Sequence, residues 1–322
     1  MAMTRRFNSL KSEDNTGFGV NSSNNAGRFY KPAGGANVEK RGIGILDRYS
    51  WYHTLLGMHR GKFLLLIFSI YILINIVFAC IYYVIGVNHL SGINASSSLK
   101  KFTEVFFFST QTFTTVGYGR ISPTGFLTSV VATFEAFLGL LSFAIATGLF
   151  YGRFSRPQAF LKFSHNAIIA PYKDGSALMF RMAPYKNNIL SEVEVKLTIA
   201  MQVQESNKKV NKFFALPIEI STINSLALSW TIVHPINEKS PLFGYAKEDI
   251  KDINLEILVF VKAFDEVFSN TVVARTSYIA EEIVWGAKFR IMYQPSSDRL
   301  KTILELNKLN SFDKVNLPGV PD

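Results

Sequence analysis

The segment Thr115-Val116-Gly117-Tyr118-Gly119 could bind a cation through its backbone rather than through charged side chains. Four such segments, one from each of four chains, can form rings of carbonyl oxygens that replace the hydration shell of K+. Gly117 and Gly119 allow backbone conformations that a side chain would disfavour, and the Thr115 hydroxyl can add an oxygen below the rings. We therefore predict a selectivity filter in which K+ binds to Thr115, Val116, Gly117 and Tyr118.

Two long apolar segments flank this motif and must position it. Residues 62–86 and 126–152 each exceed the ~20 residues that a helix needs to cross the hydrocarbon core. Residues 102–114 are too short to cross, so they predict a re-entrant pore helix whose C-terminal end directs its negative dipole toward the cation path. Residues 60–153 therefore form the predicted pore domain of an integral membrane protein. Because the chain has one copy of the motif, the ring requires a homotetramer.

Several polar residues and glycines interrupt the two apolar segments. Glu135 is costly against lipid, so we expect it to face protein or water. Asn75 can bond either to a neighbouring helix or to its own backbone. Gly139 and Gly148 permit either bending of the second helix or close packing against a neighbour. The sequence leaves the alternatives for Asn75 and for both glycines open.

Basic residues lie on the outer flanks of the two apolar segments. Their excess there places both termini in the cytoplasm. The formal net charge is +10, and its clustering beside the apolar segments favours binding of anionic phospholipids over nucleic acid. Ordinary positive-inside topology is the alternative explanation. The expected lipid-binding residues are Arg60, Lys62, Arg153, Arg156 and Lys162.

The residues before the first span predict two further segments. Residues 47–59 mix aromatic, apolar and polar positions, which is typical of a helix lying on the membrane surface. Asp47 or Ser50 could cap its start, and a short soluble loop is the alternative. Residues 1–46 are rich in Asn, Gly and Ser and predict a cytoplasmic tail that is mostly disordered.

The hydrophobic period changes after the second span. Apolar and mostly polar residues alternate over 193–203, which predicts a half-buried strand, and residues 255–261 predict another. Short strands separated by turn signals suggest a cytoplasmic β-sandwich over residues 164–300. A linker (154–163) would precede it and a C-terminal tail (301–322) would follow it. The predicted fold class is an α+β membrane protein with two transmembrane helices, a re-entrant pore helix with its filter, and this sandwich.

Five further segments, together with the filter, resemble the inward-rectifier potassium channels, and the prokaryotic branch of that family most closely. The resemblance extends over roughly residues 41–300. The loop around the filter lacks the paired cysteines typical of eukaryotic members, which favours a bacterial origin and an inner-membrane location. The five segments are RFSRP at 153–157, SWTIVHPI at 229–236, SPL at 240–242, ARTSY at 274–278 and EEIVWG at 281–286.

The resemblance implies an immunoglobulin-like sandwich and a gate at Tyr151, where four inner helices cross. A place in the interfacial aromatic belt is the alternative role of this residue. Phe143 falls where strongly rectifying relatives carry an acidic residue, so we expect only weak block by internal Mg2+ or polyamines. Ba2+ is a further expected blocker. In the family, phosphoinositides and other anionic lipids act at the junction that the basic flanks mark.

Gln111 and Arg120 are the expected supports of the filter. Many relatives place a glutamate at the position of Gln111, where it can pair with a basic residue just after the filter. Arg120 remains in this chain, and the opposite charge is expected to be missing. A neutral amide can still donate and accept hydrogen bonds, so the resemblance leaves filter stability and conductance open.

Other function classes fit the sequence less well. The five histidines show no metal-ligand spacing and no glycine-rich phosphate loop occurs, so we expect neither enzyme activity nor an organic cofactor. A potassium-uptake transporter would need four filter-like segments in one chain. A non-selective cation channel of the same architecture is the main alternative, and a membrane sensor with a silent pore is a further one. We also expect the channel to be voltage-gated.

Overall fold

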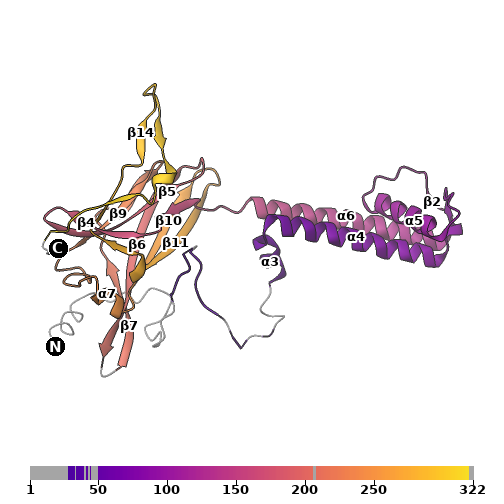
Figure 1. Cartoon of the computed structure of the whole chain (residues 1–322). Helices are drawn as coiled ribbons and strands as arrows, with labels where there is room; N and C mark the ends of the chain where they lie inside the picture. Colours follow the sequence, from indigo (N-terminus) through magenta and orange to yellow (C-terminus); the bar gives the residue numbers. More distant parts are fainter. Residues whose placement is uncertain are drawn as a thin grey trace. The chain divides into compact units, whose positions relative to one another are not determined.

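The computed structural model describes residues 28–32, 34–39, 41–42, 44, 50–205 and 208–318. They form two compact units. One contains the described residues from Arg41 to Arg156, and the other contains those up to Glu39 together with those from Pro157 onward. The first unit is helical and the second consists mainly of β-strands (Figure 1). Each unit is considered by itself below.

The described part of the helical unit contains four α-helices. Two of them, α4 and α6, lie side by side, and α5 packs against both near one end (Figure 1). A short 3-10 helix and a two-stranded pairing connect them. The elements are α3 (Trp51–Gly57), α4 (Arg60–Ile85), η1 (Val87–His89), β1 (Leu90–Ser91), α5 (Ser98–Phe113), β2 (Ser122–Pro123) and α6 (Phe126–Phe154).

Helices α4 and α6 are long and apolar enough to cross a membrane, with mean hydropathy of 2.8 and 1.9 over their most apolar windows. Large apolar side chains on α4 are exposed, among them Leu65, Phe68 and Val84. Contiguous apolar surface of this kind favours contact with lipid or with another subunit. The two helices begin and end within two residues of the spans predicted at 62–86 and 126–152.

Serine caps determine where the two shorter helices begin. Oγ of Ser50 accepts a hydrogen bond from the His53 amide, and Oγ of Ser97 accepts one from the Lys100 amide, both at 3.4 Å. Helix α3 therefore begins at Trp51, whereas the predicted surface helix began at Asp47, which lies outside the described residues. Helix α5 begins at Ser98, four residues before the predicted start. Its 16 residues span ~24 Å, less than the ~30 Å hydrocarbon core.

The β-rich unit is built on two five-stranded sheets. One has the order β11-β10-β6-β7, with β8 also paired to β6; the other has the order β12-β4-β5-β3, with β9 also paired to β5. Only the β12–β4 pair is parallel among the described strands of these sheets. The strands are β3 (Leu161–Phe163), β4 (Ala167–Tyr172), β5 (Gly175–Pro184), β6 (Leu190–Glu205), β7 (Lys208–Leu216), β8 (Thr222–Leu226), β9 (Trp230–Ile236), β10 (Glu256–Asp265), β11 (Asn270–Ile279) and β12 (Ile283–Trp285).

The core of this unit lies between the two sheets. Leu178 and Phe180 of β5 belong to one buried cluster with Val195 and Ile199 of β6. Alternate residues of β6 point inward, as the period-two pattern over 193–203 predicts. The expected β-sandwich is therefore present.

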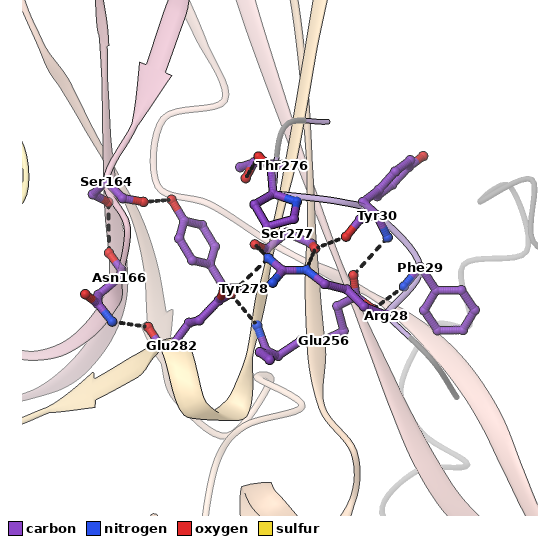
Figure 2. A network of polar contacts seen from close by, with 12 residues as sticks. Arg28, Phe29, Tyr30, Ser164, Asn166, Glu256, Thr276, Ser277, Tyr278 and Glu282 are labelled. Carbon is purple, nitrogen blue, oxygen red and sulfur yellow. Dashed lines mark hydrogen bonds and ion pairs between the residues drawn. The ribbon is translucent and has the colours of Figure 1, made fainter. Parts of the chain in front are cut away.

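Residues 28–32 form an N-terminal strap that is held on β10 and β11, within the segment 1–46 for which the composition predicts a mostly disordered tail. The Arg28 guanidinium makes two hydrogen bonds to the Glu282 carboxylate, at 2.8 and 2.9 Å (Figure 2). The amides of Phe29 and Tyr30 donate to the carboxylate of Glu256 at 2.6 and 3.1 Å. Because Glu256 is buried, these amides satisfy a carboxylate that would otherwise be costly.

Two predicted connecting segments also contain strands. The linker 154–163 includes β3, which pairs with β5. The C-terminal tail 301–322 includes β15 (Thr302–Leu304) and β16 (Phe312–Lys314), which pair with β14 (Tyr293–Pro295) and β13 (Ala287–Phe289). Strands of three residues are too short to show a recognisable period. The short elements α7 (Asp249–Asp252), η2 (Ala280–Glu282) and η3 (Leu306–Lys308) complete the unit.

The segments that carry the family resemblance are structural in this unit. The imidazole of His234 lies 2.5 Å from the Pro217 carbonyl oxygen through Nδ1 and 2.7 Å from Ser240 Oγ through Nε2. Burial lowers the pKa of His234, so the neutral ring is favoured. The Tyr278 hydroxyl donates to the Ser164 carbonyl at 2.9 Å and so connects the two sheets (Figure 2).

Candidate selectivity filter and pore lining

The filter segment begins where helix α5 ends. The amide of Thr115 donates to the Thr112 carbonyl at 3.0 Å. The amides of Val116 and Gly117 both donate to the main-chain carbonyl of Gln111, at 2.9 and 3.3 Å. The chain therefore folds back over the last turn of α5, and the negative end of the helix lies beside the filter. The Gln111 backbone thus accepts two hydrogen bonds from the filter segment.

Positive φ angles alternate along the filter segment. Thr115, Gly117 and Gly119 have φ of 60°, 51° and 78°, whereas Val116 and Tyr118 do not have positive φ. Successive residues of a regular strand point in opposite directions; alternating signs of φ allow successive carbonyls to point to one side. A threonine with positive φ costs ~1–3 kcal/mol, and such residues cluster at functional sites.

The filter residues of a single chain are largely exposed. The side chains of Val116 and Tyr118 are 53% and 79% exposed. A Cβ atom built on Gly117 or Gly119 would have no heavy atom within 4 Å. In a single chain there is therefore open space around the segment. A ring of identical chains could fill this space. The conformation, rather than local crowding, requires the two glycines.

Arg120 has an acidic partner, which corrects the expectation that the opposite charge is missing. Its Nη1 lies 3.3 Å from Oε1 of Glu104, an α5 residue that no motif in the sequence marks. Glu104 precedes Gln111 by two helical turns and is only 24% exposed. The Glu104 carboxylate can therefore hold the chain that leaves the filter through Arg120.

A buried polar cluster lies between α4, α5 and α6. We call it the carboxyl hub (Asn75, Tyr82, Ser109 and Glu135), and each of its members is 0% exposed. The Tyr82 hydroxyl lies 2.7 Å from Glu135 Oε2, and Ser109 Oγ lies 2.5 Å from Glu135 Oε1 and 3.1 Å from Asn75 Oδ1. Asn75 Nδ2 donates to the Tyr71 carbonyl of its own helix. Glu135 thus faces protein, as expected, and both alternatives for Asn75 occur together.

The two glycines of the inner helix differ in their surroundings. A Cβ atom on Gly139 would lie 1.9 Å from the carbonyl oxygen of Phe113, whereas one on Gly148 would have no neighbour within 4 Å. Close packing is therefore the observed role of Gly139. The open space around Gly148 is compatible with bending of the helix, the other predicted role, and we expect Gly139 and Gly148 to belong to the cavity and gate region of the inner helix.

The two residues expected at the cavity and the gate are both exposed on α6. Phe143 is 73% and Tyr151 is 74% exposed in the single chain. Phe143 and Gly139 line a hollow of about 750 Å³ together with Thr115 and apolar residues of α4 and α5. The structure therefore brings the filter threonine and Phe143 to one hollow, while Tyr151 lies two turns farther along the helix.

The five basic residues predicted to bind lipid are not equivalent. Arg153 donates to the carbonyls of Leu55, Leu56 and Met58 at the end of α3. Its guanidinium also lies 4.9 Å from the centre of the Phe63 ring. Arg60 and Lys62 are exposed in the first turn of α4, and Arg156 is exposed just after α6. Lys162 lies in β3 of the other unit, where its Nζ stands 5.4 Å from the Tyr185 ring centre.

Two family models match this chain. An ion channel model matches residues 66–156, and the model of the inward rectifier potassium channel C-terminal domain matches residues 161–321. The inward rectifier potassium channel Kirbac3.1 of Paramagnetospirillum magnetotacticum is 32% identical over 289 residues, covering 88% of this chain and 95% of the relative. The chain belongs to the inward-rectifier potassium channel family.

This channel is also similar to vertebrate proteins of the family. The ATP-sensitive inward rectifier potassium channel 12 of Gallus gallus is 28% identical over 286 residues, covering 81% of this chain and 66% of that protein. Among solved structures, the sporulation control protein Spo0M of Bacillus subtilis gives a TM-score of 0.22 at 8% identity, over 40% of this chain and 50% of that one. That similarity is too low to inform the fold.

Family membership confirms the expectation of a channel rather than an enzyme and corrects one part of it. Voltage-gated opening was included in the expected class, and the matching models describe an ion channel and an inward rectifier instead. Neither span carries a series of basic residues along its length, which voltage-sensing helices require. Among the described residues, no three His, Cys, Asp or Glu side chains gather as a metal site.

Proposed function

We propose that four copies of this channel close a K+-selective ring at residues 115–119. The observation that carries the proposal is the alternation of positive φ at Thr115, Gly117 and Gly119 directly after a helix too short to cross the membrane. Such a backbone can present its carbonyls to one side, and four chains around an axis supply the oxygens that K+ exchanges for water. Conduction is passive and needs no covalent chemistry.

Flux into liposomes tests this function. The purified full-length channel is reconstituted, and uptake of Rb+, K+ and Na+ is compared with and without Ba2+. The proposal predicts uptake of K+ and Rb+, exclusion of Na+ and inhibition by Ba2+. Equal uptake of Na+ would support a non-selective cation channel instead, and an absence of any flux would support a sensor with a silent pore.

We also propose that Tyr151 forms the gate and that both termini are cytoplasmic, in a bacterial inner membrane. The exposed Tyr151 ring lies one turn before the end of α6, where four aromatic rings can close a pore by contact and dewetting. The basic flanks of the two spans support the orientation. Gly148, with open space around it, leaves α6 free to bend below the hollow.

Phe143→Asp should strengthen block by internal spermine or Mg2+. Four carboxylates facing the hollow attract a cation that four phenyl rings do not, and one charge pair at 4 Å contributes ~4 kcal/mol at an effective dielectric of 20. We expect block at least ~10-fold tighter, equal to ~1.4 kcal/mol, in recordings from planar bilayers. Phe143→Asn is the neutral control and should leave block weak. Steep spermine block of the wild type would contradict the assignment.

Anionic lipid is proposed to act through the basic residues beside the spans, with Arg156 as the cleanest test. Arg156 is exposed and its side chain makes no hydrogen bond or ion pair among the described residues, whereas Arg153 also bonds to the end of α3. Because each basic residue near an anionic surface contributes ~1 kcal/mol, Arg156→Gln should weaken the response of Rb+ flux to added phosphoinositide ~5-fold. Lys239→Gln, an exposed position in the β-rich unit, is the charge-matched control. An unchanged dose response in Arg156→Gln would rule out this residue.

A further inference from the structure

We propose that Glu135 is a positioning residue for the filter, acting through Ser109 and the pore helix. The inference rests on the proposed function of residues 115–119. Gln111 and Arg120 are the expected supports of the filter. The proposal adds a buried carboxyl group on the inner helix as a support. Neither the matched families nor the relatives' names assign a role to this group.

The connection from Glu135 to the filter has two steps. Ser109, bonded to Glu135 at 2.5 Å, precedes Gln111 by two residues in the same helix. The Gln111 carbonyl accepts the amides of Val116 and Gly117. A rigid helical turn joins these two points, so a displacement of Ser109 along or around α5 displaces the first half of the filter with it.

The hub fixes α5 to both spans at once. Glu135 belongs to α6, and its second oxygen accepts the Tyr82 hydroxyl of α4. Asn75, also in α4, provides a further acceptor for Ser109. One turn after Glu135, the Gly139 backbone lies against the Phe113 carbonyl. The pore helix is thus held against α6 at two places, by hydrogen bonding at Glu135 and by close backbone packing at Gly139.

The chemistry of the hub favours positioning over stability. Apolar packing is already available there, since the rings of Tyr82 and Phe108 lie 5.2 Å apart. A buried polar group is costly unless every hydrogen bond is made, and well-packed apolar replacements are often neutral or stabilising. Apolar contacts do not fix the direction and length of the contact between two helices, whereas hydrogen bonds do. A filter of defined diameter requires such a fixed contact.

The experiment uses the full-length tetramer and three substitutions. Glu135→Leu removes both hydrogen-bond contacts while nearly preserving volume. Glu135→Gln keeps an acceptor for the Tyr82 hydroxyl and offers a donor to Ser109. Ser109→Ala removes the hydrogen bonds from α5 to Glu135 and to Asn75 and leaves the Tyr82–Glu135 bond in place. Ser129→Ala is the matched control, because within the described part of the chain the Ser129 hydroxyl bonds only to the Gly125 carbonyl, one turn earlier in the same helix region. Assembly is checked by size-exclusion chromatography, and Na+ and Rb+ uptake and Ba2+ inhibition are then measured.

Glu135→Leu and Ser109→Ala should raise the ratio of Na+ to Rb+ uptake by ~10-fold or more and weaken Ba2+ inhibition ~10-fold, which corresponds to ~1.4 kcal/mol. Glu135→Gln and Ser129→Ala should stay within ~2-fold of the wild type. If Glu135→Leu does not assemble, Ser109→Ala decides the matter, since it deletes one small hydroxyl.

An assembled Ser109→Ala or Glu135→Leu channel with wild-type selectivity and Ba2+ inhibition would overturn the positioning role. Loss of selectivity in Glu135→Gln to the level of Glu135→Leu would overturn the hydrogen-bond mechanism. Failure of the proposed function itself appears differently, because the wild-type channel would then already admit Na+ as readily as Rb+.

Discussion

Gly139→Ala should abolish K+ flux, whereas Gly148→Ala should leave flux within about twofold of the wild type. The added methyl group at Gly139 would lie 1.9 Å from the Phe113 oxygen and 2.8 Å from its carbonyl carbon. Both are backbone atoms, so the collision can be relieved only by moving α5 away from α6. Overpacking of this kind costs ~1–3 kcal/mol per subunit or more, and the displaced helix carries the filter.

Rb+ uptake into liposomes containing equal amounts of each variant is the measurement. Both substitutions replace glycine by alanine in one helix, so their effects on helix propensity are the same, ~1 kcal/mol in favour of alanine. The difference between them therefore reports the contact with Phe113. Equal, near-normal flux through both variants would show that α5 does not sit against Gly139 in the conducting channel.

Gly117→Ala should eliminate selective K+ conduction. The residue has a φ of 51°, a conformation that costs an L-amino acid ~1–2 kcal/mol in each of four subunits. An alanine would escape this cost by returning to negative φ, which turns the adjoining carbonyl away from the ion path. We expect Rb+ uptake near background, or uptake that no longer discriminates between Rb+ and Na+.

Gly175→Ala is the control for this substitution, since Gly175 lies in β5 without positive φ and with open space around it. It should conduct like the wild type. If Gly117→Ala retained selective uptake, the positive φ at that position would not be essential and the proposed carbonyl ring would lose its main support.

The features that span many residues could be predicted from the sequence. Two continuous apolar runs gave α4 and α6 to within two residues, because their hydropathy leaves few alternatives. The filter could be found because Gly117 and Gly119 are separated by one residue and lie between those runs. Alternation over 193–203 predicted β6 for the same reason: the pattern repeats enough times to exclude chance.

Features that depend on one contact between distant residues could not be predicted. Glu104 contacts Arg120 only because the chain that leaves the filter returns alongside α5. Arg28 bonds to Glu282, which lies 254 positions farther along the chain, and no local pattern in the sequence marks this pair. Two members of the carboxyl hub, Asn75 and Glu135, could be noticed as polar residues in apolar runs. Their partners Tyr82 and Ser109 are ordinary residues of their helices until the three helices pack.

The position of bound ions tests the central claim most directly. Crystals of the detergent-solubilised channel grown in Rb+ or Tl+ should show anomalous scattering peaks on a four-fold axis, each surrounded by carbonyl oxygens of residues 115–118 from four chains. A tetramer with an ordered segment at these residues but no ion on its axis would contradict the claim, as would ions bound only by side-chain carboxylates elsewhere.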